Sequence, residues 1–207
     1  AAPSRKTDAE KALSCAALQN KHFRLAIGHA IDRGAYVSQN VGEDLSLQSV
    51  RNSITPGTYV SLEEDVTIDI NGTATTFPKG TWYGAIVQAQ LDADNFGLQI
   101  WDAENLTNDG WDAWYNPAKA MEELQIAIEE LKAAGYEGSK ENPIVMDYPY
   151  PSYNEVGQNQ CYVLKTCIES AFDGLVRFDA LPLNNVTEFL NVQNNTNNGS
   201  EHNTDMG

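Results

Sequence analysis

The sequence predicts an α/β protein, because a strand, a helix and a second strand follow one another between residues 143 and 181. The stretches Pro143 to Tyr150 and Leu175 to Leu181 alternate between apolar and polar side chains, as half-buried strands do. Residues 155–172 between them have the apolar spacing of a helix. A run of this length is that of a right-handed crossover, so we expect the two strands to be parallel neighbours.

A second observation is a helix with defined ends over residues 117–134. Asn116 supplies an N-cap and Pro117 occupies the first helical position. Gly135 follows the last residue of the apolar pattern, where glycine commonly ends a helix.

The amino-terminal segment predicts two more helices. Thr7 or Asp8 can cap the first of them, and Asn20 can cap the second. We expect Gly34 to interrupt the second helix. A short last helix is expected around residues 186–190.

The middle of the chain predicts less regular structure. Two short alternating stretches within residues 66–77 flank Asn71-Gly72, which is a strong indication of a β-hairpin turn. Residues 40–62 and 78–116 show no clear period, so we expect irregular surface segments there.

The composition excludes several classes of protein. The 207 residues include 29 acidic and 13 basic side chains, for a net charge of −16, which disfavours nucleic-acid binding. No apolar run approaches the roughly 20 residues that span a bilayer. The first residues lack the apolar region of a signal peptide, so it is either absent or removed. Three cysteines leave one unpaired, and we expect Cys161 and Cys167 to be buried as small apolar side chains.

The residue patterns do not indicate catalysis. His22 and His29 are seven residues apart, about 10 Å along a helix, which is too far for one metal ion. The sequence has no nucleophile elbow, Walker motif or dinucleotide-binding glycine motif. We therefore expect no catalytic residue, metal site or cofactor, and we expect these histidines and His202 to be solvated or to cap helices.

A window of carboxylates and aromatic rings leaves a second hypothesis open. A glycoside hydrolase needs two carboxyl groups about 5–9.5 Å apart beside a sugar that stacks on aromatic rings. The alternative function is therefore a secreted carbohydrate-binding or glycoside-hydrolase-like domain, although packing of the tryptophans in the core is the simpler explanation. A purely structural interaction module is a third hypothesis. The residues of the window are Asp102, Glu104, Asp109 and Asp112, among Trp101, Trp111, Trp114 and Tyr115.

A tyrosine cluster is the best candidate for a ligand site. It follows the first strand of the predicted crossover, and ligands of open α/β sheets bind at the carboxyl ends of strands. Tyrosine offers a flat apolar face and a hydroxyl group, which suits ligands with varied side chains. The other possibility is a proline-rich turn with locally packed tyrosines. The candidate ligand-binding residues are Tyr148, Tyr150, Tyr153 and Asn154.

The segment from Asn20 to Arg33 resembles a motif of the family 5 extracellular solute-binding proteins, the dipeptide, oligopeptide and nickel binders of ABC importers. Three later segments are similar to family motifs in the same order, and the long insert before Trp111 most resembles Gram-positive oligopeptide or pheromone receptors. The matching residues of the first motif are Arg24, Ala26, Ala30, Ile31, Asp32 and Arg33. The later segments are Ser53-Ile-Thr-Pro56-Gly57, Tyr115-Asn-Pro117-Ala-Lys-Ala120 with Gly135-Tyr136, and Thr187-Glu-Phe-Leu.

The resemblance implies one lobe of a two-lobed, class II periplasmic-binding-protein clamshell, with a mixed sheet flanked by helices over residues 1–207. An oligopeptide would lie between the lobes, held largely through its backbone. The parent would be a non-enzymatic, extracytoplasmic lipoprotein that serves the permease subunits of an ABC importer. In that picture Asp32 and Arg33 form an ion pair or a helix-end contact.

The carboxyl end departs from the family pattern. The family continues from a segment like Asp205-Met206-Gly207 into a tryptophan and then an Asp-Tyr pair, whose aspartate receives the amino group of the peptide. This sequence stops before that pair. We therefore expect a lobe that is truncated at its carboxyl end and that cannot enclose a peptide alone.

Overall fold

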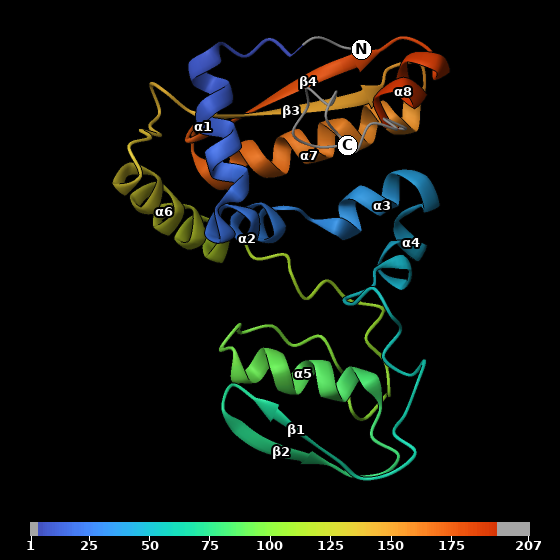
Figure 1. Ribbon diagram of the computed structural model, residues 1–207. Helices are drawn as coiled ribbons and strands as arrows, with labels where there is room; N and C mark the ends of the chain where they lie inside the picture. Colours follow the sequence, from blue (N-terminus) through green and yellow to red (C-terminus); the bar gives the residue numbers. More distant parts are fainter. Residues whose placement is uncertain (1–3, 194–207) are drawn as a thin grey trace. The chain divides into compact units, whose positions relative to one another are not determined.

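The computed structural model describes residues 4–193, and the chain divides into two compact units (Figure 1). Unit 1 is formed by residues 1–40 and 115–207, and unit 2 by residues 41–114. His202 and the predicted carboxyl-terminal truncation fall outside the described residues. The prediction of a single lobe over residues 1–207 stays a prediction.

Unit 1 is built on the predicted strand–helix–strand run. β3 (Ile144–Pro151) and β4 (Val176–Leu183) pair in parallel, in register from Ile144 opposite Val176 to Pro151 opposite Leu183. The crossover helix α7 (Glu155–Phe172) runs alongside the two strands (Figure 1). The predicted α/β class and the parallel pairing are confirmed.

One face of this sheet carries the main core. Apolar side chains of α7 pack there with those of α1 (Asp8–Gln19), α2 (Lys21–Ala30) and α6 (Pro117–Ala133). The largest fully buried side chains of this cluster include Phe23, Leu124, Met146, Ile168, Phe172 and Phe178. The predicted last helix is also present, as α8 (Val186–Gln193).

The Asp147 side chain and the backbone of Val145, both in β3, are bound to the amino-terminal segment. The Ser14 hydroxyl donates a hydrogen bond of 2.6 Å to the Val145 carbonyl. Lys6 Nζ lies 3.3 Å from Asp147 Oδ2, and both side chains are buried. Removal of either partner of such a buried ion pair is destabilising, because it leaves a buried charge without compensation.

The break in the amino-terminal helices differs from the prediction. Gly34 lies inside α3 (Arg33–Val41), and the interruption is at Ile31 and Asp32 instead. Asp32 starts the new helix, because its Oδ1 accepts a 2.8 Å hydrogen bond from the Ala35 N–H. The helix-end contact implied for Asp32 is therefore present. Side-chain capping decided the boundary here, rather than the flexibility of glycine.

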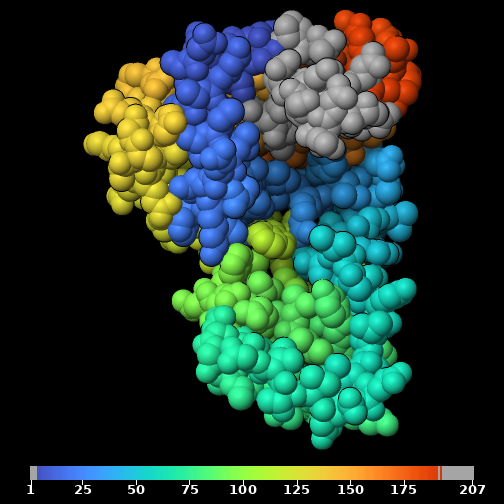
Figure 2. All heavy atoms as spheres, in the orientation of Figure 1, coloured from blue at the N-terminus to red at the C-terminus, as the bar shows by residue number. Residues whose placement is uncertain are grey.

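Unit 2 contains the predicted hairpin. β1 (Val66–Ile70) and β2 (Thr73–Phe77) are antiparallel, and both turn residues, Asn71 and Gly72, have positive φ values of 52° and 82°. The space-filling view shows the hairpin and α5 (Tyr83–Ala93) packed into one continuous body (Figure 2).

The prediction of irregular structure was wrong for α5 and for α4 (Glu43–Ser46), which is followed by a single 3-10 turn. The residue before α5 is Trp82, whose side chain makes no capping hydrogen bond. Long-range contacts stabilise α5 instead. The buried indole of Trp101 lies against Gly84 and Gly57, where it leaves no room for a Cβ atom at either position. A helix held by tertiary packing shows little in its own sequence.

Replacement of Gly84 by alanine should destabilise unit 2, because the added methyl group would overlap the Trp101 ring. We expect a loss of about 1–3 kcal/mol, as for other overpacked cores. All four tryptophans (Trp82, Trp101, Trp111 and Trp114) lie in unit 2, so tryptophan fluorescence during urea unfolding measures this unit specifically. The control is Gly138→Ala in unit 1, where the nearest atom to the new Cβ would be 3.6 Å away. Equal unfolding midpoints for the two variants would contradict the packing argument.

Candidate functional site

The candidate site is the edge of unit 1 where β3 and β4 both end. The loop after β3 is fixed to the end of β4, because the Ser152 N–H and hydroxyl both donate hydrogen bonds to the Leu183 carbonyl, at 3.0 and 2.8 Å. The Gln158 amide donates a 2.7 Å hydrogen bond to the Ser152 carbonyl. Gly157 permits close packing of the helix, since a Cβ there would lie 2.5 Å from Pro151 Cγ. The loop is therefore held rigidly at the carboxyl ends of two parallel strands.

The four predicted residues divide between this loop and the core. Tyr148 and Tyr150 project from one face of β3 and pack partly against the main core. Tyr153 lies in the loop, with 43% of its surface exposed. The structure therefore places Tyr148 and Tyr150 together, and Tyr153 is the most accessible of the three.

Tyr148 is the most strongly built into the protein. Its ring centroid lies 5.5 Å from that of Phe178. Burial is the main cause that raises the pKa of Tyr148 above its ordinary value, and a hydrogen bond with the Tyr36 side chain adds to it. Tyr36 comes from α3, and local sequence patterns could not have identified this partner. The Tyr148 ring thus serves packing first.

Asn154 has a definite structural role. Its Oδ1 accepts hydrogen bonds from the N–H groups of Val156 at 2.9 Å and Gly157 at 3.4 Å, and so caps α7. These bonds satisfy backbone donors that the first turn of a helix leaves unpaired. Any contact of Asn154 with a ligand would have to leave this oxygen in place.

The carbohydrate hypothesis is not favoured by the positions of its residues. Trp101 is only 5% exposed, so it cannot offer its face to a sugar. The Trp111 indole N–H donates a 3.1 Å hydrogen bond to the Gln99 carbonyl. Hydrogen bonds from Asn105, together with one from the Glu104 N–H, lower the pKa of Asp102 and close a local turn.

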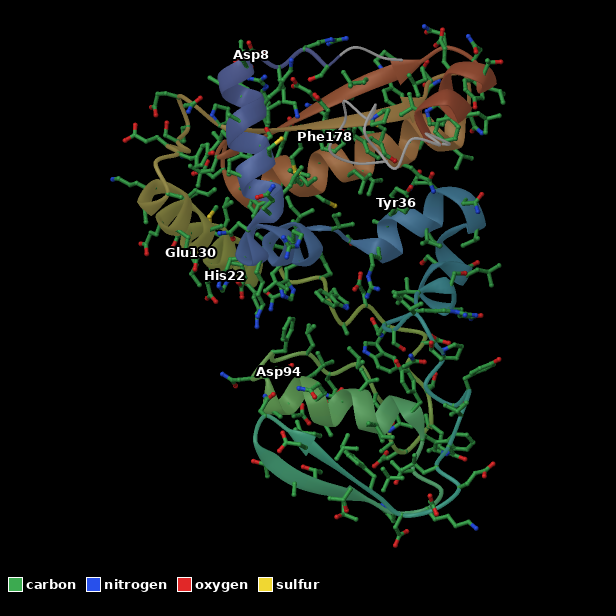
Figure 3. All side chains as sticks on the ribbon, viewed as in Figure 1. Asp8, His22, Tyr36, Asp94, Glu130 and Phe178 are labelled. Atoms are coloured by element: carbon green, nitrogen blue, oxygen red, sulfur yellow. The ribbon has the colours of Figure 1, made fainter. Side chains whose placement is uncertain are left out.

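The histidines were predicted to be solvated or to cap helices, and His29 is not solvated, since it is 1% exposed. His22 bridges α2 and α6, with Nδ1 2.6 Å from Glu123 Oε2 and Nε2 3.9 Å from Glu130 Oε1 (Figure 3).

Cys161 is buried as predicted, and burial raises its pKa to about 11. Cys167 is only half-buried. Within residues 4–193, no group of three or more His, Cys, Asp or Glu is placed to hold a metal ion. Over the same range, each helix is too short or too polar to cross a bilayer.

Comparison with known proteins gives a consistent set of relatives. The oligopeptide-binding protein AliB of Streptococcus pneumoniae serotype 4 is 31% identical over 81% of this chain. AmiA, an oligopeptide-binding protein of the same organism, is 30% identical over 98% of the chain. The chain is homologous to streptococcal oligopeptide-binding proteins. It spans 22% of the length of AliB and 27% of AmiA.

Two further comparisons add context. No model of a known protein family matches the chain. A crystal structure of the peptide-binding protein of a peptide ABC transporter aligns with 95% of the chain and 61% of its own length, at a TM-score of 0.45 and 18% identity. The homology confirms the resemblance to oligopeptide-binding proteins that the motifs indicated.

Removal of the Asn154 side chain tests its capping role. We expect Asn154→Ala to lower the free energy of unfolding of unit 1 by about 1 kcal/mol, because α7 loses its cap. Asn154→Ser should restore most of this loss, since a hydroxyl oxygen also caps helices. Thermal unfolding followed by far-ultraviolet circular dichroism measures both variants. Full stability of the alanine variant would contradict the cap.

Alkaline pH should destabilise the protein through Tyr148. The unfolded chain releases this proton near pH 10, whereas the raised pKa retains it in the folded chain. The stabilisation is therefore complete below about pH 10 and is lost as the pH rises through the folded pKa. Ultraviolet absorbance of tyrosinate should show a component that titrates above the ordinary tyrosine range and that is missing in Tyr148→Phe. Tyr162→Phe, at a 71% exposed position, is the control and should keep this component.

Proposed function

We propose that this chain is part of an extracytoplasmic substrate-binding protein that captures oligopeptides for an ABC importer. The observation that carries the proposal is the 30% identity with the oligopeptide-binding protein AmiA over 98% of the chain. The 31% identity with AliB over 81% of the chain also supports it. The relatives are several times longer, so the proposed activity belongs to a longer protein that includes this segment.

The proposed contribution of this chain is one wall of a peptide cleft in a two-lobed protein. Tyr153 and Tyr150 lie at the carboxyl edge of two parallel strands, where open α/β sheets bind ligands. The apolar ring and hydroxyl of tyrosine can contact many peptide side chains without selecting one. Tyr148 would support this wall by packing against the core, and Asn154 would support it by capping α7.

The same proposal defines the partners. The longer protein would be a membrane-anchored lipoprotein that passes peptide to the permease subunits, with no cofactor and no catalytic step. The net charge of −16 disfavours nucleic acid as a partner. The carbohydrate-binding alternative has no comparable support, since its central tryptophan is buried.

Calorimetry with a mixed peptide pool tests whether peptide binding requires the longer protein. The 207-residue chain alone should show no saturable binding in the micromolar range, because a single wall cannot enclose a peptide. The longer protein that carries this segment should bind the pool. Saturable binding by the isolated chain at micromolar or lower peptide concentrations would refute the single-wall proposal.

Variants of the longer protein then test the wall itself. Tyr153→Ala should weaken peptide binding roughly fivefold, or about 1 kcal/mol, as expected for an aromatic contact at an interface. Tyr162→Ala is the matched control, because Tyr162 is an exposed tyrosine on α7 outside the loop. Equal effects of the two variants would exclude the loop as the binding wall.

A further inference from the structure

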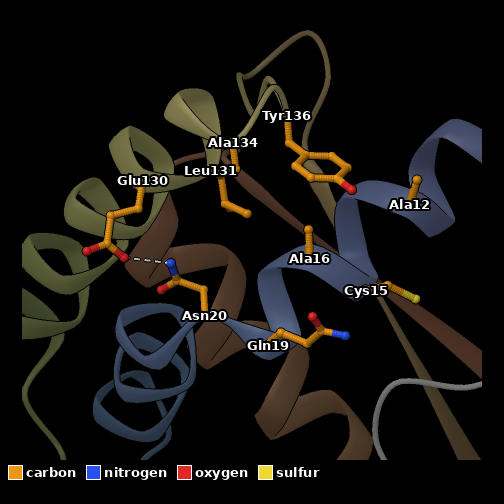
Figure 4. Close-up of a pocket in the computed structure, with 9 residues that line it drawn as sticks. All are labelled: Ala12, Cys15, Ala16, Gln19, Asn20, Glu130, Leu131, Ala134 and Tyr136. Atoms are coloured by element: carbon orange, nitrogen blue, oxygen red, sulfur yellow. Dashed lines mark hydrogen bonds between the residues drawn. The ribbon is translucent and has the colours of Figure 1, made fainter.

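Unit 1 has a surface pocket of about 430 Å³ that is separate from the loop after β3. It lies between α1 and the carboxyl-terminal end of α6 (Figure 4). The lining residues are Ala12, Cys15, Ala16, Gln19 and Asn20 on one side, and Glu130, Leu131, Ala134 and Tyr136 on the other. Its size is within the range of small-molecule sites in proteins.

The pocket exists because small side chains line it. Alanines at positions 12, 16 and 134 leave space where larger side chains would fill the gap between the helices. Asn20 fixes one end, because its Oδ1 accepts the Phe23 N–H at 3.0 Å and its Nδ2 donates to Glu130 Oε2 at 2.7 Å. The pocket is therefore largely formed before any ligand enters.

The lining combines an apolar floor with a single charge. Leu131 and the alanines supply apolar surface to the lining, called the floor here, and Glu130 is the only charged side chain among the lining residues. The Glu130 side chain is 53% exposed; its Oε2 accepts the hydrogen bond from Asn20, and its Oε1 lies 3.9 Å from His22 Nε2. The Tyr136 ring reaches towards α1 at the opposite end (Figure 4).

The lining favours a small ligand that carries a positive charge and an apolar part. An anion would be repelled by Glu130 and by the net charge of −16. A neutral apolar molecule would gain only the contact with the floor. A small cation with an alkyl chain can pair its charge with the carboxylate and cover the apolar lining, including the Tyr136 ring, with its chain.

We propose that the pocket between α1 and α6 binds a small organic cation, namely a primary ammonium group on a short alkyl chain. The ammonium group lies at Glu130, and the chain covers the alanine floor towards Tyr136. The site is distinct from the proposed peptide wall, since the two share no residue. Binding is weak, in the millimolar range, because an exposed ion pair contributes little.

Nuclear magnetic resonance titration of the 207-residue chain with n-butylammonium tests the site. Saturable shifts are expected at the backbone amides of Ala12, Ala16 and Gln19. Glu130→Gln should weaken binding about fivefold, the upper range for an exposed ion pair. Its amide oxygen can still accept the hydrogen bond from Asn20. Glu129→Gln is the matched control, because it removes the same charge from the neighbouring exposed position and should leave affinity unchanged.

Two further measurements complete the test. Ala12→Leu places a larger side chain at an exposed helical position of the lining and should abolish the shifts. The neutral probe n-butanol should bind at least fivefold more weakly than n-butylammonium. Equal weakening by Glu129→Gln and Glu130→Gln would show nonspecific attraction and overturn the site. So would unchanged affinity in a folded Ala12→Leu variant, or the absence of saturable shifts.

Discussion

The parallel pairing of β3 and β4 is the constraint on which unit 1 depends. Parallel neighbours cannot be joined by a tight turn, so the chain must return along the full length of the strand before it pairs again. The 18 residues of α7 cover about 27 Å, and the eight residues of each strand cover about 26 Å. The match lets α7 bring the chain back to the start of the sheet. Both strands then end at the same edge.

At the edge where β3 and β4 end, a few residues have both structural roles and proposed binding roles. Asn154 must cap α7 directly after the strand, and Gly157 must be small because the helix starts against Pro151. Tyr148, earlier in β3, packs against the Phe178 ring and interacts with the Tyr36 side chain. Tyr153 is exposed, whereas Tyr148 and Tyr150 are both partly buried, so Tyr153 retains the most surface that a ligand could reach. The tyrosine cluster thus contains both residues with structural contacts and residues that could contact a ligand.

Local patterns predicted most elements of unit 1, apart from the break between α2 and α3, because its helices carry their own boundaries. Asn116 and Gly135 delimit α6, and the hairpin of unit 2 is defined by Asn71-Gly72. The helix α5 escaped prediction because it lacks a side-chain cap and is held by Trp101, which is distant in sequence. The hydrogen bond between Tyr36 and Tyr148 escaped for the same reason. Sequence patterns identified the candidate loop, but only the fold shows that Tyr153 is exposed while Tyr148 and Tyr150 are partly buried against the core.

The irregular segments of unit 2 are ordered by buried amide side chains. Three buried amide side chains, Asn52, Gln88 and Asn108, supply hydrogen bonds that a sheet or helix would otherwise provide. Gln88 Oε1 accepts the Ile100 and Trp101 N–H groups at 2.8 and 3.2 Å. Asn52 donates to the Asn108 and Trp111 carbonyls, and Asn108 accepts the Gly57 N–H. A composition rich in asparagine therefore need not indicate a flexible loop, because here the amides hold the buried backbone in place.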